Sequence, residues 1–201
     1  MTTNLIVREN YVHHNTGPGL WTDINNSDVL YENNVVEWNT REGIKHEISY
    51  HAVIRNNIVG YNGRAKDVWL WGAQILVQNS RDVHVYDNDV TVAADASDGI
   101  AIINQNRYHP TQSPTPYLTA NNRIVNNVIR YMGMAGSSGI VDDSDGQAAV
   151  TGAHHNVWDA NLYLGSGGFL SGRRWDYGPP MSWADFQAAD QEPNGTTTPT
   201  D

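Results

Sequence analysis

Apolar and polar residues alternate in short runs along most of the chain, and one arrangement of them recurs six times. It is an apolar residue, two further residues, an asparagine, one further residue and a second apolar residue. The asparagines of the six copies are Asn10, Asn33, Asn56, Asn88, Asn127 and Asn161. They stand 23, 23, 32, 39 and 34 residues apart, which indicates a basic repeat of about 23 residues with insertions in the later copies.

A second short pattern follows each asparagine and consists of a glycine, or once a glutamine, before a large apolar residue. Its copies are Gly19–Leu20, Gly43–Ile44, Gln74–Ile75, Gly99–Ile100, Gly139–Ile140 and Gly168–Phe169. Both segments of the repeat are short, rich in β-branched residues and bounded by Asn, Gly and Asp, which is typical of strands separated by turns. We therefore predict an all-β solenoid, a parallel β-helix of about six coils with two strand segments in each coil.

The recurring asparagines are expected to be structural. Equivalent positions of successive coils lie about 4.8 Å apart in a stacked solenoid, so inward asparagines can pass amide hydrogen bonds along the stack. Asparagine also tolerates the left-handed backbone of a tight corner. A helical fold does not fit, because the chain has 18 glycines and its apolar residues alternate. A propeller does not fit either, because its blades need roughly 40 residues each.

We predict one β-helical body over residues 1–181, with loop insertions at about 59–73, 104–121 and 142–156. The first residues lead straight into a strand-like segment and contain no apolar core of a signal peptide. Because the first coil of a solenoid needs a cap, we expect this chain to be the C-terminal part of a longer secreted protein that lacks its N-terminal coils here. The expected location is extracellular or on the cell surface.

The other end of the stack is expected to be covered by a short helix within residues 182–191. Ser182 is a good N-cap, and Asp185 stands three residues later, as in a capping box. Such a helix would cover the unpaired backbone and apolar side chains of the last coil. Residues 192–201 are predicted to form a disordered tail.

The second segments of the first two coils place two acids together. Side chains alternate between the two faces of a strand, and with the glycines as register marks Asp23 and Glu47 fall at equivalent outward positions of adjacent coils. Their backbones should then lie about 5 Å apart. Two carboxylates that close repel each other, so the pKa of one should rise unless a cation lies between them. The same count places Gln78 and Asp143 at this position in later coils.

Aromatic and basic residues flank this pair. Trp21 and Lys45 occupy the neighbouring outward positions, while His46 should point inward as a buried, hydrogen-bonded histidine. Tryptophan and tyrosine, of which the chain has 7 and 10, offer flat faces for sugar rings. Two insertions add further candidates, since loops on a rigid scaffold often carry binding residues. The residues expected to bind a sugar are Trp21, Lys45, Trp69, Trp71, Gln78 and Arg107.

Paired carboxyl groups allow two kinds of chemistry. Glycoside hydrolysis uses one as acid and the other as nucleophile or base, with about 5–5.5 Å between them in retaining enzymes and roughly 6.5–9.5 Å in inverting ones. The residues do not decide which of Asp23 and Glu47 takes which part. Alternatively, the two acids could bind Ca²⁺, which prefers oxygen ligands. The simplest alternative is a solvated outer face that carries two acids without function.

Composition narrows the choice of partner. Asp plus Glu number 22 and Lys plus Arg 12, so the net charge of −10 repels phosphate backbones and argues against nucleic acid. The sequence has no cysteine, which excludes disulfides and thiol chemistry. It contains no run of 18 apolar residues, so we expect no membrane-spanning helix.

The repeated Asn-x-Val and Gly-Ile segments resemble the right-handed parallel β-helix superfamily over roughly residues 4–191. That group includes pectate lyase-like polysaccharide lyases, several glycoside hydrolase families, alginate epimerases and phage tailspikes. Residues 19–57 look most like secreted β-helix proteins and some β-helix glycosidases, in which an acid follows the first Gly-[Leu/Ile]-Trp and another follows the Gly-Ile of the next coil. Asp23 and Glu47 match these positions. Lyases of this fold typically need Ca²⁺ ligands and a basic residue, and Lys45 is the only basic residue in the reconstructed groove.

We therefore expect an extracellular polysaccharide-active enzyme, a glycoside hydrolase with Asp23 and Glu47 as its paired carboxyls. A calcium-dependent polysaccharide lyase is one alternative. A non-catalytic module that binds carbohydrate at a cell surface is another, and a structural spacer is a third. The fold alone does not decide among them, because one fold hosts many chemistries.

Overall fold

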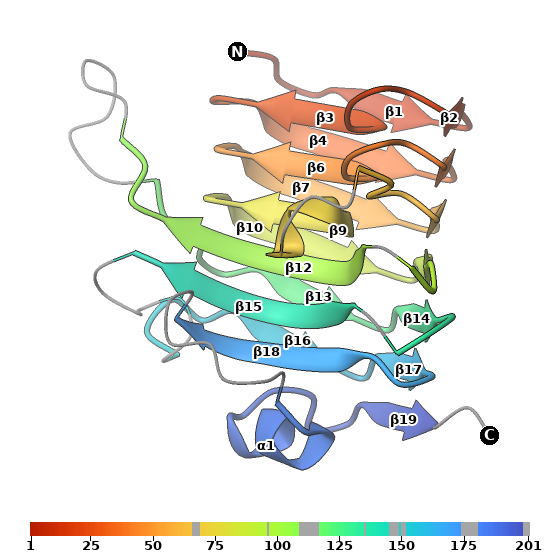
Figure 1. Ribbon diagram of the computed structural model, residues 1–201. Coiled ribbons are helices and arrows are strands. Elements are labelled where there is room, and N and C mark those ends of the chain that lie inside the picture. Colours follow the sequence, from red (N-terminus) through yellow and green to blue (C-terminus); the bar gives the residue numbers. More distant parts are fainter. Residues whose placement is uncertain are drawn as a thin grey trace.

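A computed structural model describes residues 1–65, 69–95, 97–108, 117–134, 136–144, 149, 152–173 and 181–198. The chain winds into a right-handed parallel β-helix, whose coils are stacked from the N-terminus to the C-terminus (Figure 1). The predicted fold class is confirmed. Each coil contributes three strands rather than the predicted two segments, because the first segment bends at its asparagine and forms a strand on either side of it.

Every third strand belongs to the same sheet, and all neighbours within a sheet are parallel. Sheet A contains β1 (Ile6–Arg8), β4 (Ser27–Glu32), β7 (Tyr50–Arg55), β10 (Arg81–Tyr86), β13 (Arg123–Val125) and β16 (Val157–Asp159). Sheet B contains β2 (Tyr11–His13), β5 (Val35–Glu37), β8 (Ile58–Gly60), β11 (Asp89–Val92), β14 (Val128–Tyr131), β17 (Leu162–Leu164) and β19 (Thr196–Thr198). Sheet C contains β3 (Leu20–Asp23), β6 (Ile44–Glu47), β9 (Ala73–Gln78), β12 (Asp98–Gln105), β15 (Ser137–Asp143) and β18 (Gly168–Arg173).

The corner between sheets A and B carries the predicted ladder of asparagines. Each side-chain amide donates to the side-chain oxygen of the next coil, as between Asn57 Nδ2 and Asn88 Oδ1 at 2.9 Å. The members of the ladder are Asn10, Asn34, Asn57, Asn88, Asn127 and Asn161. Buried amides are thereby paired along the whole stack, which removes the cost of leaving them without a partner.

In two coils the predicted register is wrong by one residue. Asn33 and Asn56, which match the sequence pattern, precede the ladder residues Asn34 and Asn57 and take left-handed φ angles of 55° and 52°. Asparagine is among the residues that adopt this conformation most readily. The corner therefore uses two neighbouring residues, one for the left-handed turn and one for the ladder.

Inside the stack, the inward side chains of all three sheets form one hydrophobic core. Ile44, Ile75, Ile100 and Ile140, predicted to point inward, belong to it, and Leu20 packs against it. A smaller apolar cluster lies on the outer face of sheet C, where Leu70 covers Leu76, Ala101 and Val141. Leu70 comes from the short 3₁₀ helix η1 (Trp69–Gly72), within the predicted insertion at 59–73.

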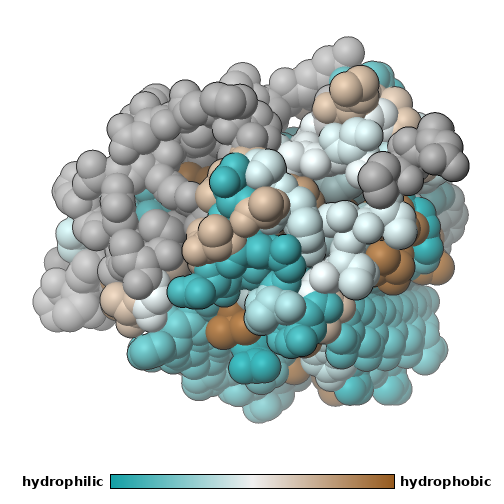
Figure 2. All heavy atoms as spheres, turned by 90° about the horizontal axis from the view of Figure 1, so that it is seen from below, coloured by the Kyte–Doolittle hydropathy of each residue, from teal (hydrophilic) through white to brown (hydrophobic). Residues whose placement is uncertain are grey.

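The C-terminal end is covered by helix α1 (Trp183–Ala188). Ser182 is its N-cap and accepts a hydrogen bond from the Asp185 backbone N–H at 3.2 Å. Phe186 is fully buried against the last coil. Seen from this end, polar and intermediate residues cover most of the described surface, with only small hydrophobic areas (Figure 2).

The predicted disordered tail is wrong for the part of it that the structure describes. Strand β19 pairs in parallel with β17, and the side chain of Glu192 continues the asparagine ladder, accepting from Asn161 Nδ2 at 2.5 Å. This segment forms a further partial coil, because it satisfies backbone and side-chain groups that the last full coil would leave unpaired.

Candidate active site on sheet C

The predicted acid pair lies at the end of the first two strands of sheet C. Strands β3 and β6 pair in register, so that Asp23 is the partner of Glu47 and Trp21 the partner of Lys45. Ile44 belongs to the core, and His46 beside it is fully buried. The intervening positions carry the polar and aromatic groups on the other face, as the strand alternation requires. Asp23 and Glu47 therefore occupy equivalent positions of adjacent coils, about 4.8 Å apart along the stack.

Two cations hold the carboxylate of Glu47. Lys45 Nζ lies 2.9 Å from Oε2, and Arg107 Nη1 lies 3.3 Å from Oε1. Glu47 is only 6% exposed, so these contacts operate where water screens charge poorly. Arg107 reaches the site because it lies just beyond β12, where its backbone carbonyl accepts from the Tyr117 N–H at 2.9 Å. The predicted contribution of Arg107 to this face thus has a structural basis.

Asp23 stands in a different environment from its neighbour. Burial raises the pKa of its carboxyl and the charge of Glu47 raises it further, while Lys45 and Arg107 act in the opposite direction. Its Oδ1 is buried and has no hydrogen-bond partner among the described residues. One acid is therefore disposed to keep its proton, while the other is paired with cations. This is the arrangement that assigns an acid and a base within a carboxyl pair.

Lys45 connects the pair to an exposed aromatic ring and to a third acid. Its Nζ lies 5.3 Å from the ring centroid of Trp21, which is 53% exposed, and 3.7 Å from Glu42 Oε1. Glu42 is fully buried, and neither of its carboxylate oxygens has a hydrogen-bond partner in the described part of the chain. Arg41 Nε approaches its Oε2 at 3.6 Å. Glu42 was missed in the sequence because it lies at the corner before β6, where strand alternation does not apply.

Gln78 follows Glu47 in the register, as predicted, but it is 1% exposed. Its Nε2 donates to Gln105 Oε1 at 2.6 Å, and Gln105 Nε2 donates to Asp143 Oδ2 at 3.0 Å. Asp143 therefore pairs with Gln105 and is not equivalent to Asp23. The predicted register fails there because Gly139 pairs with Ala101 rather than with Gly99.

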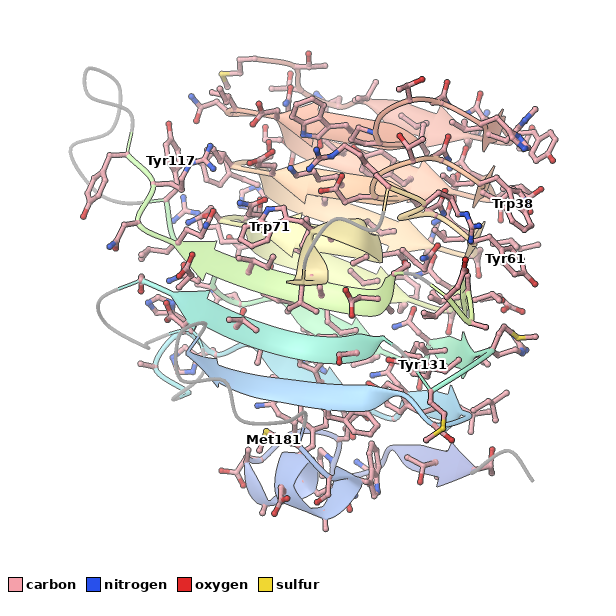
Figure 3. The ribbon with its side chains drawn as sticks, in the orientation of Figure 1. Trp38, Tyr61, Trp71, Tyr117, Tyr131 and Met181 are labelled. Carbon is pink, nitrogen blue, oxygen red and sulfur yellow. The ribbon has the colours of Figure 1, made fainter. Side chains whose placement is uncertain are left out.

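The outer face is open over fewer coils than the sequence indicated. The outward positions Leu76, Ala101 and Val141 are buried, because η1 lies over them. Trp71 packs against this cluster and lies against the outer face of sheet C (Figure 3). The side chain of Trp69 lies outside the described residues. Trp21 is thus an exposed aromatic residue beside the acid pair on this face.

His46 takes the position that the sequence predicted. It is fully buried, and its Nδ1 lies 2.8 Å from Thr22 Oγ1, which also accepts from the Tyr31 hydroxyl at 2.9 Å. Burial lowers the pKa of His46 to about 3. The imidazole is therefore neutral and faces the core, which does not suit a base acting on a substrate at the surface.

The donor set around the pair does not suit the calcium ion that the sequence left open as an alternative. Two carboxylates are available, but Lys45 and Arg107 already occupy Glu47, and their charges oppose a divalent cation. Over the residues that the structure describes, no three His, Asp or Glu side chains converge as metal ligands. We derive no chemistry through a metal at this site.

The comparison with family models agrees with the fold. The family model described as "Right handed beta helix region" matches residues 1–90, and the predicted resemblance to right-handed β-helix proteins is confirmed. The A-module of the mannuronan C-5 epimerase AlgE4 of Azotobacter vinelandii is similar at 16% identity and a TM-score of 0.31. The similarity covers 98% of this chain and 59% of that one, so the chain spans less than two thirds of its length. No curated protein matches the sequence.

No helix among the described residues is both long and apolar enough to span a membrane.

Proposed function

We propose that this β-helix is a polysaccharide-cleaving enzyme, a glycoside hydrolase, with Asp23 as its general acid and Glu47 as the carboxylate that acts at the sugar. The observation that carries the proposal is the contrast within the pair. Asp23 and Glu47 are register partners, yet burial and its neighbour raise the pKa of Asp23 while two cations contact Glu47. A carboxyl pair divided in this way is the chemical requirement for cleaving a glycosidic bond.

In the proposed reaction Asp23 gives its proton to the glycosidic oxygen as the bond to the anomeric carbon breaks. Glu47 forms a bond to that carbon, and water activated by the ionised Asp23 later releases the sugar and returns the proton. Register partners on adjacent coils favour the short separation of retaining enzymes, so we expect the product to keep its anomeric configuration. The 3.3 Å contact of Arg107 with Glu47 is long enough to yield to an incoming sugar.

Substrate binding is proposed for the groups around the pair. The exposed ring of Trp21 offers a flat apolar face to a pyranose, and Lys45 and Arg107 offer donors to its oxygens. Trp71, which is partly exposed, lies further along sheet C, where it would meet a more distant sugar unit, whereas the buried Gln78 is not available to a sugar. Since polymeric glycans are mostly found outside cells, we also propose an extracellular or cell-surface location.

A non-catalytic binding module is the second candidate, and one observation favours it. Lys45 and Glu47 are 8% and 6% exposed and already satisfy each other, so the acids could serve only to hold the binding face together. A panel of neutral and acidic polysaccharides distinguishes the two, with reducing ends and the absorbance of unsaturated products followed together. We expect new reducing ends without unsaturation. Unsaturated product would identify a lyase instead, and binding without any product would support the module.

A further inference from the structure

A shallow trough lies on the outer face of sheet A. Figure 1 shows this sheet behind sheet C. Its lining includes Asp28, Leu30, His51, Val53, Arg55 and Tyr86. These residues come from three successive strands of sheet A, β4, β7 and β10. None of them belongs to the proposed cleavage site, so the trough calls for an explanation of its own.

The floor of the trough is apolar. Leu30 of β4 and Val53 of β7 are register partners. Their neighbours along the strands, Val29, Ala52 and Ile54, are buried in the core, so Leu30 and Val53 face outward. Both are partly exposed. Two branched side chains in line along the stack thus form a small apolar strip at the floor of the trough.

One wall is a clamp of two acids around a histidine. His51 Nδ1 lies 3.6 Å from Asp28 Oδ1, and its Nε2 lies 3.4 Å from Asp82 Oδ2. All three residues have left-handed φ angles, 56° for Asp28, 49° for His51 and 59° for Asp82, and each is the second residue of its strand. The wall therefore presents carboxylate acceptors and an imidazole along the stack.

The opposite wall holds an oriented guanidinium. Arg55 Nε and Nη2 donate to Glu32 Oε2 at 3.1 and 2.8 Å, and its Nη1 donates to the Tyr86 hydroxyl at 3.1 Å. Its side chain is still 38% exposed. A guanidinium fixed by two partners loses little side-chain entropy when it binds a third group.

We propose that this trough binds one or two pyranose units of a neutral polysaccharide, as a site separate from the proposed cleavage site. A pyranose has apolar C–H faces and a rim of hydroxyls that both donate and accept. The strip of Leu30 and Val53 matches the faces, and the acid–histidine and arginine–tyrosine walls match the rim. Acids on both walls, Asp28 and Glu32, disfavour a polyanion.

The trough would hold a polymer against the face opposite to the one where it is cut, so that cleavage products stay close to the enzyme. A polymer bound at one of two linked sites has a higher effective concentration at the other site. The trough does not depend on cleavage, and it would equally serve a protein that only binds.

The test is affinity electrophoresis through gels that contain galactomannan, arabinoxylan or mixed-linkage β-glucan, with the inactive double variant Asp23→Asn/Glu47→Gln as background. Val53→Arg fills the floor without touching the core, and Arg55→Gln removes the guanidinium but leaves the floor intact. Val157→Arg is the matched control, since Val157 lies in the same outward row three coils away. We expect at least one of the gels to retard the background protein. Its affinity for that polysaccharide should be at least tenfold weaker in Val53→Arg and in Arg55→Gln. In the control Val157→Arg the affinity should stay within twofold of the background.

Retardation that persists in both trough variants, or that none of the three gels produces, would overturn the proposal. Sedimentation of the same proteins provides an independent check. If the background protein self-associates, and Val53→Arg makes it monomeric without changing its retardation, the trough is an interface between copies and not a glycan site. Loss of retardation with normal cleavage of short oligosaccharides by Val53→Arg in the otherwise native protein separates this site from the acid pair.

Discussion

Asp23 and Glu47 are chemically similar and sit side by side, yet their surroundings differ. Glu47 contacts Lys45 and Arg107, whereas burial acts on Asp23 without a hydrogen bond to its Oδ1 from the described residues. Such a site costs stability when both acids are ionised. Strain of this kind, kept at a surface that also carries an exposed tryptophan, is typical of a functional site.

Asp23→Asn should raise the stability of the protein at neutral pH. The folded-state pKa of Asp23 is raised, so the folded protein favours the protonated form, and stability from this group is lost as pH rises through that pKa. The variant should therefore have a higher denaturation midpoint than the wild type at pH 7, with the difference fading as the pH falls below about 3.9, the ordinary pKa of an unfolded aspartic acid. Glu37→Gln, which removes a partly exposed carboxylate of sheet B, is the control. A less stable Asp23→Asn at pH 7 would contradict the assigned environment.

Glu42 is proposed as a positioning residue for Lys45. Glu42→Gln removes a buried negative charge 3.7 Å from Lys45 Nζ, so the cations near Asp23 are less compensated and its pKa should fall. The carboxyl carbon signal of Asp23 in NMR titrations should move to lower pH, and the alkaline limb of the activity profile should shift with it. Glu37→Gln should move neither. An unchanged titration in Glu42→Gln would remove Glu42 from the site.

The sequence was sufficient to predict the acid pair with Trp21 and Lys45 beside it, but not the contacts of Glu42 and Arg107. Asp23 and Glu47 lie in the first two coils, where the repeat has no insertion and counting from glycine to glycine gives the true register. The contact of Glu42 with Lys45 is made from the corner before β6. The contact of Arg107 with Glu47 spans two coils. Neither follows from strand periodicity, because both depend on how the chain leaves a strand.

The asparagine ladder explains why the strands of each coil can be so short. Many have three or four residues, and a strand of that length is weak alone. The ladder pairs every corner with the next through both backbone and side chain, as where Asn34 N and Nδ2 donate to Asn57 Oδ1. Stability is thus shared between neighbouring coils, as expected for a solenoid.

Asn57→Ala should destabilise the fold by about 3 kcal/mol or more, because it leaves the buried backbone N–H of Asn34 without its acceptor and removes three further hydrogen bonds, from Asn34 Nδ2 and to Asn88 Oδ1 and the Tyr31 carbonyl. Asn10→Ala is the matched control, since Asn10 ends the ladder at an exposed position and should cost about 1 kcal/mol or less. Urea unfolding of both variants measures the difference. Equal losses would mean that the ladder does not contribute as a continuous element.

The positions of the asparagine corners were predictable from the sequence, whereas the course of the inserted segments was not. Pattern counting identified the insertion that contains η1, but not that it would cover Leu76, Ala101 and Val141 on sheet C. The sequence did contain a signal for this cover. Apolar residues at successive outward positions indicate that another segment lies over them, because exposed apolar rows are rare. The shift of register between β12 and β15 also follows an insertion, and no residue count reveals how many positions a loop absorbs.

The molecule as a whole is a stack with its C-terminal end closed by α1 and β19 (Figure 1). Phe186 packs against Trp158 and Phe169, with ring centroids 6.3 and 5.1 Å apart. Without this cover the last coil would expose aromatic side chains and unpaired strand edges, which promote association.

Phe186→Ala should cost about 3–5 kcal/mol of stability and cause self-association on warming, because it leaves a cavity under the cap. Ala184→Ser, at an exposed position of the same helix, should leave both properties unchanged. Thermal unfolding with light scattering detects both effects. A Phe186→Ala protein as stable and as monomeric as the control would show that the cap is dispensable.

The central claim is that Asp23 and Glu47 cleave a glycosidic bond together, and the most direct measurement is the release of reducing ends. The wild type is compared with Asp23→Asn, Glu47→Gln and the control Glu37→Gln on a polysaccharide that the wild type degrades. We predict that each site variant loses activity by about 10²–10⁴-fold while Glu37→Gln keeps it. Full activity in either Asp23→Asn or Glu47→Gln would contradict the account.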